Sequence, residues 1–64
     1  MKRRQLIKML EWEGFVFERH GSGHDIYRRG NEEEVIPRHR EINERLAGAI
    51  LRKWGIREWI MYIL

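Results

Sequence analysis

Hydrophobic residues at the start of the chain recur at the spacing of an α-helix. Leu6, Ile7 and Leu10 fall on one side of a helical pattern, and Gly14 follows as a residue that ends helices. We therefore expect an amphipathic helix over residues 3–13.

Three segments in the middle of the chain have the composition of β-strands. They are rich in β-branched and aromatic residues, and glycine-containing turns separate them. The expected strands are residues 15–20, 24–29 and 33–37, with turns at 21–23 and 30–32. Turns this short join antiparallel neighbours.

A second amphipathic helix follows the strands. Its apolar positions recur at helical spacing between residues 42 and 54, with Asn43 as the expected N-cap and Gly55 just past its end. A short last helix is expected over residues 57–63. The order α-β-β-β-α with this added helix indicates an α+β fold, in which a three-stranded antiparallel sheet has helices on one face and is open on the other.

The pleat of the second strand divides its side chains between the two faces of the sheet. His24 and Ile26 share one face, and Asp25 and Tyr27 share the other. Because Ile26 is apolar, we expect its face to look inward. His24 would then lie at the rim of that face, beside the turn.

Composition favours one soluble domain over residues 1–64. Charged residues make up 36% of the chain. It has no cysteine, and this excludes disulfides and thiolate metal sites. Lys8 and Glu11 interrupt the first apolar run, so it does not form the core of a signal peptide. No segment approaches membrane-spanning length. We expect a cytoplasmic protein.

Positive charge is concentrated in the first half of the chain. Residues 1–31 carry seven Lys/Arg against four Asp/Glu, whereas residues 32–64 carry six of each, and the net charge is +3. This excess favours a polyanionic partner such as nucleic acid. An ordinary basic domain is the alternative.

Two histidines flank the glycine–serine–glycine turn in "RHGSGHDIYRR", residues 19–29, among several arginines. An imidazole gives or takes a proton near neutral pH, and arginine binds phosphate oxygens. Cleavage of RNA needs proton transfer, because the 2′-hydroxyl loses a proton and the leaving 5′-oxygen gains one. It also needs positive charge to stabilise the phosphate in the transition state. His24 is the candidate catalytic residue, with an exposed histidine of no function as the alternative.

Further cationic and polar residues are candidate RNA contacts. The cations at the start of the first helix oppose its dipole, which indicates either a bound anion or a frayed terminus. His39 lies in a basic loop, and its alternative is a solvated position. The candidate contacts are Lys2, Arg3, Arg4, Arg19, His20, Ser22, Arg28, Arg29, Arg38 and His39.

A metal site is the alternative use of the histidines. His20, His24 and His39 with Asp25 would supply the ligands, but no cysteine or second carboxylate is nearby. We expect neither a metal nor a cofactor.

Three segments together resemble the HicA toxin family. They are "LIKMLEWEGF", "ERHGSGHDIY" and "VIPRHREINERLAGAILRKWGI", and the resemblance covers roughly residues 3–56. It implies a double-stranded-RNA-binding-domain-like fold and a small ribosome-independent mRNA endonuclease, acting on single-stranded mRNA and paired with a HicB-type antitoxin. The family's essential histidine follows a Gly-Ser turn and corresponds to His24. This chain has one extra glycine, Gly23, before it, and Asp25 where a second histidine is frequent.

The sequence therefore predicts a metal-independent mRNA endonuclease toxin that uses His24. The second proton-transfer group is left open among His20, water and a substrate phosphate oxygen. One alternative is an RNA-binding module of the same fold without catalysis. Another is an interaction protein that docks through its last residues, "EWIMYIL".

Overall fold

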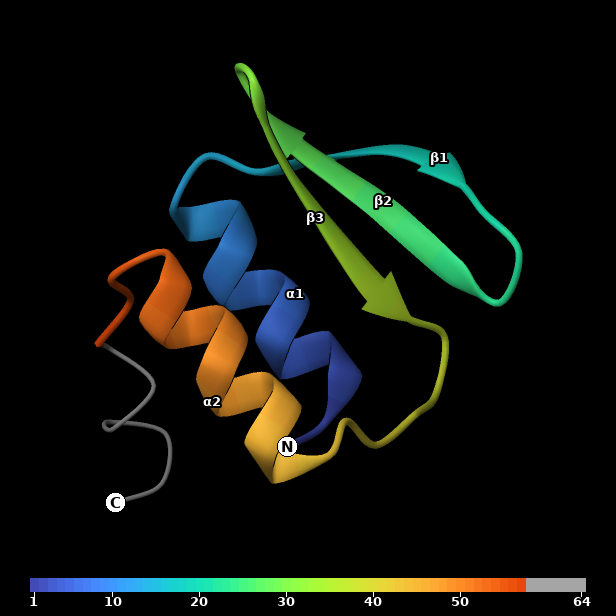
Figure 1. Ribbon diagram of the computed structural model, residues 1–64, viewed down its shortest axis with the longest axis vertical. Helices are drawn as coiled ribbons and strands as arrows, with labels where there is room; N and C mark the ends of the chain where they lie inside the picture. Colours follow the sequence, from blue (N-terminus) through green and yellow to red (C-terminus); the bar gives the residue numbers. More distant parts are fainter. Residues whose placement is uncertain (58–64) are drawn as a thin grey trace.

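The computed structural model describes residues 1–57, and Figure 1 shows the arrangement of its helices and strands. In chain order the elements are α1 (Arg3–Trp12), β1 (Val16–His20), β2 (His24–Arg29), β3 (Glu32–Pro37) and α2 (Glu44–Lys53). The predicted order α-β-β-β-α is confirmed, and the strands form an antiparallel sheet in the order β1-β2-β3. The expected last helix, apart from its first residue, lies outside the described residues.

The two helices lie side by side and pack against one side of the sheet (Figure 1). Leu6, Met9 and Leu10 of α1 are almost fully buried, as is Leu51 of α2. From the sheet, Ile36 joins this core. The amphipathic pattern of the sequence therefore forms one core between the helices and the sheet.

The register of β2 and β3 decides which face of the sheet the helices cover. Tyr27 lies opposite Glu34, and Asp25 lies opposite Ile36. Directly opposed residues point to the same face, and both Tyr27 and Ile36 belong to the core with the helices. The covered face is therefore that of Asp25 and Tyr27.

The expectation that Ile26 faces inward was wrong. Ile26 is only 4% exposed, but it lies opposite Val35 on the other face of the sheet and outside the helix-packed core. Alternation along a strand defines two faces but does not identify the covered one, because both faces of β2 carry an apolar residue. His24, which shares the face of Ile26, consequently starts β2 on the open face.

The two helices begin differently. At α2, the Asn43 side chain accepts hydrogen bonds from the backbone N–H groups of Arg45 and Leu46, at 2.8 and 3.4 Å, which confirms the predicted N-cap. At α1, Lys2 occupies the N-cap position without a side-chain cap, and the first turn has no acidic residue. Within residues 1–57, neither helix is long and apolar enough to cross a membrane.

Candidate functional site

The turn between β1 and β2 places the His24 imidazole against the backbone of Gly21. The Gly21 N–H donates to the His24 carbonyl at 2.7 Å. A Cβ added to Gly21 would lie 3.1 Å from both Cδ2 and Nε2 of His24. Glycine at position 21 therefore leaves the space that the imidazole occupies, and the ring is partly buried as a result.

On the helix-facing side of the same hairpin, His20 is hydrogen bonded to Asp25. The turn pairs these two residues across β1 and β2, and His20 Nδ1 lies 2.7 Å from Asp25 Oδ1. The His20 side chain is 72% exposed, whereas that of Asp25 is 7% exposed. Nδ1 is engaged by the carboxylate, so Nε2 is the ring nitrogen left to exchange a proton with a ligand.

Asp25 also binds two arginines from distant parts of the chain. Arg3 Nη2 lies 2.5 Å from Oδ2, and Arg38 Nη1 lies 2.8 Å from Oδ1. The hydrogen bond with His20, followed by that with Arg38, lowers the pKa of Asp25 from 3.8 to about 2 despite its burial. At neutral pH this carboxylate is therefore ionised, and it joins three potential cations.

Arg38 fixes the hairpin turn as well. Its Nη2 donates to the Gly21 carbonyl at 2.8 Å, and its Nη1 donates to the His24 carbonyl at 3.0 Å. Arg3 Nε donates to the Pro37 carbonyl at 2.8 Å. The start of α1 and the end of β3 thus hold the segment that carries both histidines.

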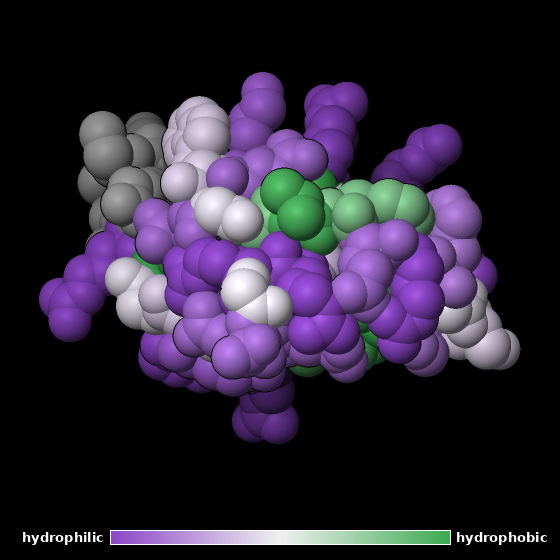
Figure 2. Space-filling model, turned by 90° about the horizontal axis from the view of Figure 1, so that it is seen from above, coloured by the Kyte–Doolittle hydropathy of each residue, from purple (hydrophilic) through white to green (hydrophobic). Residues whose placement is uncertain are grey.

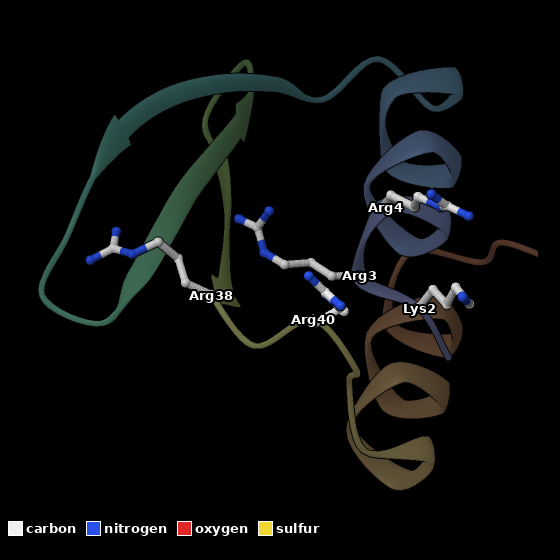
Figure 3. Close-up of a pocket in the computed structure, with 5 residues that line it drawn as sticks. All are labelled: Lys2, Arg3, Arg4, Arg38 and Arg40. Atoms are coloured by element: carbon white, nitrogen blue, oxygen red, sulfur yellow. The ribbon is translucent and has the colours of Figure 1, made fainter.

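A cavity of about 480 Å³ lies beside this network, and its lining is entirely cationic: Lys2, Arg3, Arg4, Arg38 and Arg40. In Figure 3, Arg38 extends toward the β1–β2 turn and Arg3 toward the sheet, whereas Lys2 extends from just before α1 and Arg4 from its first turn. Among residues 1–57, the side chains of Lys2, Arg4 and Arg40 have no hydrogen-bond or ion-pair partner. We call this cavity the cationic pocket. Its charge suits phosphate groups.

Two arginines of the strands, Arg19 and Arg28, form ion pairs with neighbouring carboxylates. Arg19 pairs with Glu18, and Arg28 pairs with both Glu18 and Glu33. Their positive charge is therefore largely compensated by neighbouring carboxylates. Their predicted role as phosphate contacts stays a prediction.

Arg29 has a structural role in the sheet. Its Nε donates to Glu32 at 2.7 Å, and its guanidinium lies 4.6 Å from the centre of the Phe15 ring and 5.6 Å from that of Trp54. These contacts extend the core at the end of β2 away from the histidines. Its proposed phosphate contact also stays a prediction.

The remaining predicted site residues lie in exposed loops. Ser22 is at the tip of the β1–β2 turn, and His39 follows β3. In the part of the chain that the structure describes, no group of three or more His, Asp, Glu or Cys side chains has a metal-binding arrangement. The alternative metal site is therefore not formed by these residues as they are placed here.

Sequence reasoning missed the function of Asp25 as the residue that joins His20 to the cationic pocket. The signal was the spacing of the hairpin, because the turn at residues 21–23 and the first residue of β2, His24, lie between the paired positions 20 and 25. The sequence by itself offered Asp25 only as an alternative metal ligand, because its partners Arg3 and Arg38 lie far from it in the chain.

The face of the molecule seen in Figure 2 is mostly hydrophilic. A patch of apolar side chains lies in its upper half. The large hydrophobic side chains exposed on the described part of the chain include Phe17, whose ring lies 4.8 Å from that of His20. An exposed aromatic ring therefore adjoins the imidazole.

Comparison with models of protein families matches residues 3–56 to a family described as the HicA toxin of bacterial toxin–antitoxin systems. The match includes every helix and strand described above. Searches of curated proteins and of solved structures found no significant match.

Proposed function

Because the chain belongs to the HicA toxin family of bacterial toxin–antitoxin systems, we propose that it is a toxin that cleaves mRNA. The observation that carries this proposal is the family match over residues 3–56 of a 64-residue chain. The α-β-β-β-α order is compatible with a double-stranded-RNA-binding-domain-like fold. Messenger RNA as substrate places its action in the cytoplasm.

The proposed reaction is attack of the RNA 2′-hydroxyl on the adjacent phosphorus. His24 exchanges a proton with one of the reacting oxygens, which is the work that an imidazole performs near neutral pH. The cationic pocket supplies the second requirement, because fixed positive charge stabilises the negative charge on the phosphate oxygens in the transition state. Acid–base catalysis and electrostatic stabilisation together need no metal ion.

The cationic pocket is also the proposed binding site for the RNA backbone. The side chains of Lys2, Arg4 and Arg40 have no hydrogen-bond or ion-pair partner in the described residues, so binding a phosphate to them breaks no existing ion pair. Neutralising phosphates releases counterions, and the affinity for single-stranded RNA then falls with salt at a logarithmic slope of roughly 0.7 per contact. Replacing one contacting cation should reduce the slope by about that amount.

A toxin of this family has an antitoxin partner. We propose that a HicB-type antitoxin covers the histidines and places carboxylates against the cationic pocket. This arrangement competes directly with RNA phosphates. Toxin–antitoxin affinity that is independent of salt would contradict the electrostatic part of this proposal.

The test is incubation of the purified chain with a mixed-sequence RNA in the presence of a chelator, comparing wild type with His24→Ala. We expect cleavage by wild type alone, leaving 2′,3′-cyclic phosphate ends. Salt-sensitive binding with intact RNA in both samples would instead establish an RNA-binding module without catalysis. Equal cleavage by both proteins would exclude His24 from the chemistry.

A further inference from the structure

The His20 imidazole contacts both the Asp25 carboxylate and the Phe17 ring, although its side chain is on the surface. Its Nδ1 lies 2.7 Å from a carboxylate that is 7% exposed, and its ring lies 4.8 Å from the Phe17 ring at an interplanar angle of 54°. The side chain is nevertheless 72% exposed. The hydrogen bond and the ring contact thus favour one orientation of an exposed imidazole, in which Nδ1 faces the carboxylate.

The partner of His20 is part of a larger charged assembly. Asp25 is hydrogen bonded to Arg3 and Arg38, both of which line the cationic pocket. The carboxylate therefore connects the imidazole to the place where phosphate charge would be bound. A carboxylate on Nδ1 orients an imidazole and balances the positive charge that the ring carries when it is protonated at both nitrogens.

The two histidines flank the turn on opposite faces of the sheet. His20 shares the face of Asp25, its cross-strand partner, whereas the neighbouring His24 points to the other face. When a nucleophile displaces a leaving group at phosphorus, the attacking and leaving oxygens lie roughly in line on opposite sides of it. A phosphate at the end of the hairpin is then approached by one imidazole from each face.

We propose that His20 is a second catalytic residue, the general acid that protonates the leaving 5′-oxygen, and that Asp25 is its positioning residue. This inference rests on the proposed endonuclease function. The 2′-oxygen forms a bond to phosphorus as His24 takes its proton, the bond from phosphorus to the 5′-oxygen breaks, and His20 Nε2 gives its proton to that oxygen. The products are a 2′,3′-cyclic phosphate and a 5′-hydroxyl, and exchange with water restores both histidines.

His24 fits the role of the base in this pair. Its imidazole lies against Gly21 and has no carboxylate in contact within the described residues. The guanidinium of Arg38 lies nearby, donating to the His24 carbonyl at 3.0 Å. This surrounding offers no counter-charge for a protonated ring, whereas Asp25 offers one to His20.

The test compares an ordinary RNA with one in which sulfur replaces the leaving 5′-oxygen at a single position. Sulfur leaves without being protonated, so loss of the general acid slows only the ordinary substrate. We expect His20→Gln to slow cleavage of the ordinary RNA by roughly 100-fold or more. On the sulfur-containing RNA, the variant should cleave nearly as fast as wild type, whereas His24→Ala should stay slow on both.

Binding and folding are measured alongside. A 2′-deoxy substrate that cannot be cleaved should bind wild type and His20→Gln equally, and the exposed position of His20 should leave the circular dichroism spectrum unchanged. Arg52→Gln is the matched control, since Arg52 is an exposed cation on α2 that does not line the pocket. It should cleave both substrates like wild type.

Each failure has a distinct signature. If His20→Gln cleaves the ordinary RNA as fast as wild type, the inference is overturned and the proposed function stands. If the variant is slow on both substrates, His20 is not the leaving-group acid and the proposal is again wrong. If wild type leaves both RNAs intact, the endonuclease function itself is refuted and the inference falls with it.

Discussion

Replacing Gly21 by alanine should move the His24 imidazole with little effect on folding. A Cβ at this position would meet Cδ2 and Nε2 of His24 at 3.1 Å and the His24 carbonyl oxygen at 3.2 Å, which is tighter than ordinary van der Waals contact. The φ angle of Gly21 is not in the left-handed region, so the backbone accepts an alanine. The ring has to shift by a few tenths of an ångström.

The expected effects on stability and on catalysis differ in size. His24 is only partly buried, so its ring can move slightly away from the added methyl group, and the free energy of unfolding should change by less than about 1 kcal/mol. A displacement of about 1 Å at a catalytic group lowers rates roughly 100-fold. A shift of a few tenths of an ångström should therefore lower the cleavage rate by roughly tenfold.

Gly30→Ala is the matched control, in the turn between β2 and β3. Gly30 has a φ of +58°, and nothing lies within 4 Å of the added Cβ. Alanine in this left-handed conformation costs about 1–2 kcal/mol but leaves the His24 ring where it is. The two variants should thus show opposite patterns, one losing activity and the other losing stability.

The assay measures the single-turnover cleavage rate at saturating protein and the free energy of unfolding in urea, for wild type and both variants. The reasoning is refuted if Gly21→Ala cleaves RNA at the wild-type rate. It is also refuted if Gly30→Ala, while still folded, loses as much activity as Gly21→Ala, because the loss would then follow stability and not the position of the imidazole.

Three further predictions concern folding. Phe15 is fully buried, so Phe15→Ala should cost about 3–5 kcal/mol; a urea midpoint unchanged from wild type would contradict this. Asn43→Ala removes the hydrogen bonds from the Arg45 and Leu46 N–H groups to the Asn43 side chain and should lower the free energy of unfolding by about 1 kcal/mol. Urea unfolding measures this loss, and near the wild-type urea midpoint the variant should show less helical circular dichroism signal. The pKa of Asp25 is lowered in the folded state to about 2, so its contribution to stability is present above its unfolded pKa of 3.8 and is lost as the pH falls toward 2. Melting temperatures of wild type and Asp25→Asn should converge over that interval, and parallel pH profiles would show that Asp25 does not drive the acid sensitivity.

Several features of this chain follow from residues close together in the sequence. The helical spacing of Leu6 and Leu10 and the cap at Asn43 are set within one or two turns of backbone, and both elements form where the sequence predicts them. The strands are likewise separated by turns of only two or three residues. Local hydrogen bonding and local apolar periodicity are enough to specify such elements.

The candidate site needed the tertiary structure to a much greater extent. Arg4 and Arg28 are the same residue type, yet the Arg4 side chain lines the cationic pocket with no carboxylate partner among residues 1–57, whereas Arg28 is paired with Glu18 and Glu33. A cation is available to a ligand only when no carboxylate lies close to it. That condition depends on the fold, and composition cannot show it.

By itself, the sequence determined the order of helices and strands, the α2 cap and the motifs of the HicA family. Only the tertiary structure decided that Tyr27, and not Ile26, faces the helices, and that His20 is joined through Asp25 to the cationic pocket. The physical reason is the separation in sequence between the residues that make each contact. Elements form through contacts a few residues apart, whereas the Arg3–Asp25 and Arg38–Gly21 hydrogen bonds join residues 22 and 17 positions apart and form only after the helices pack on the sheet.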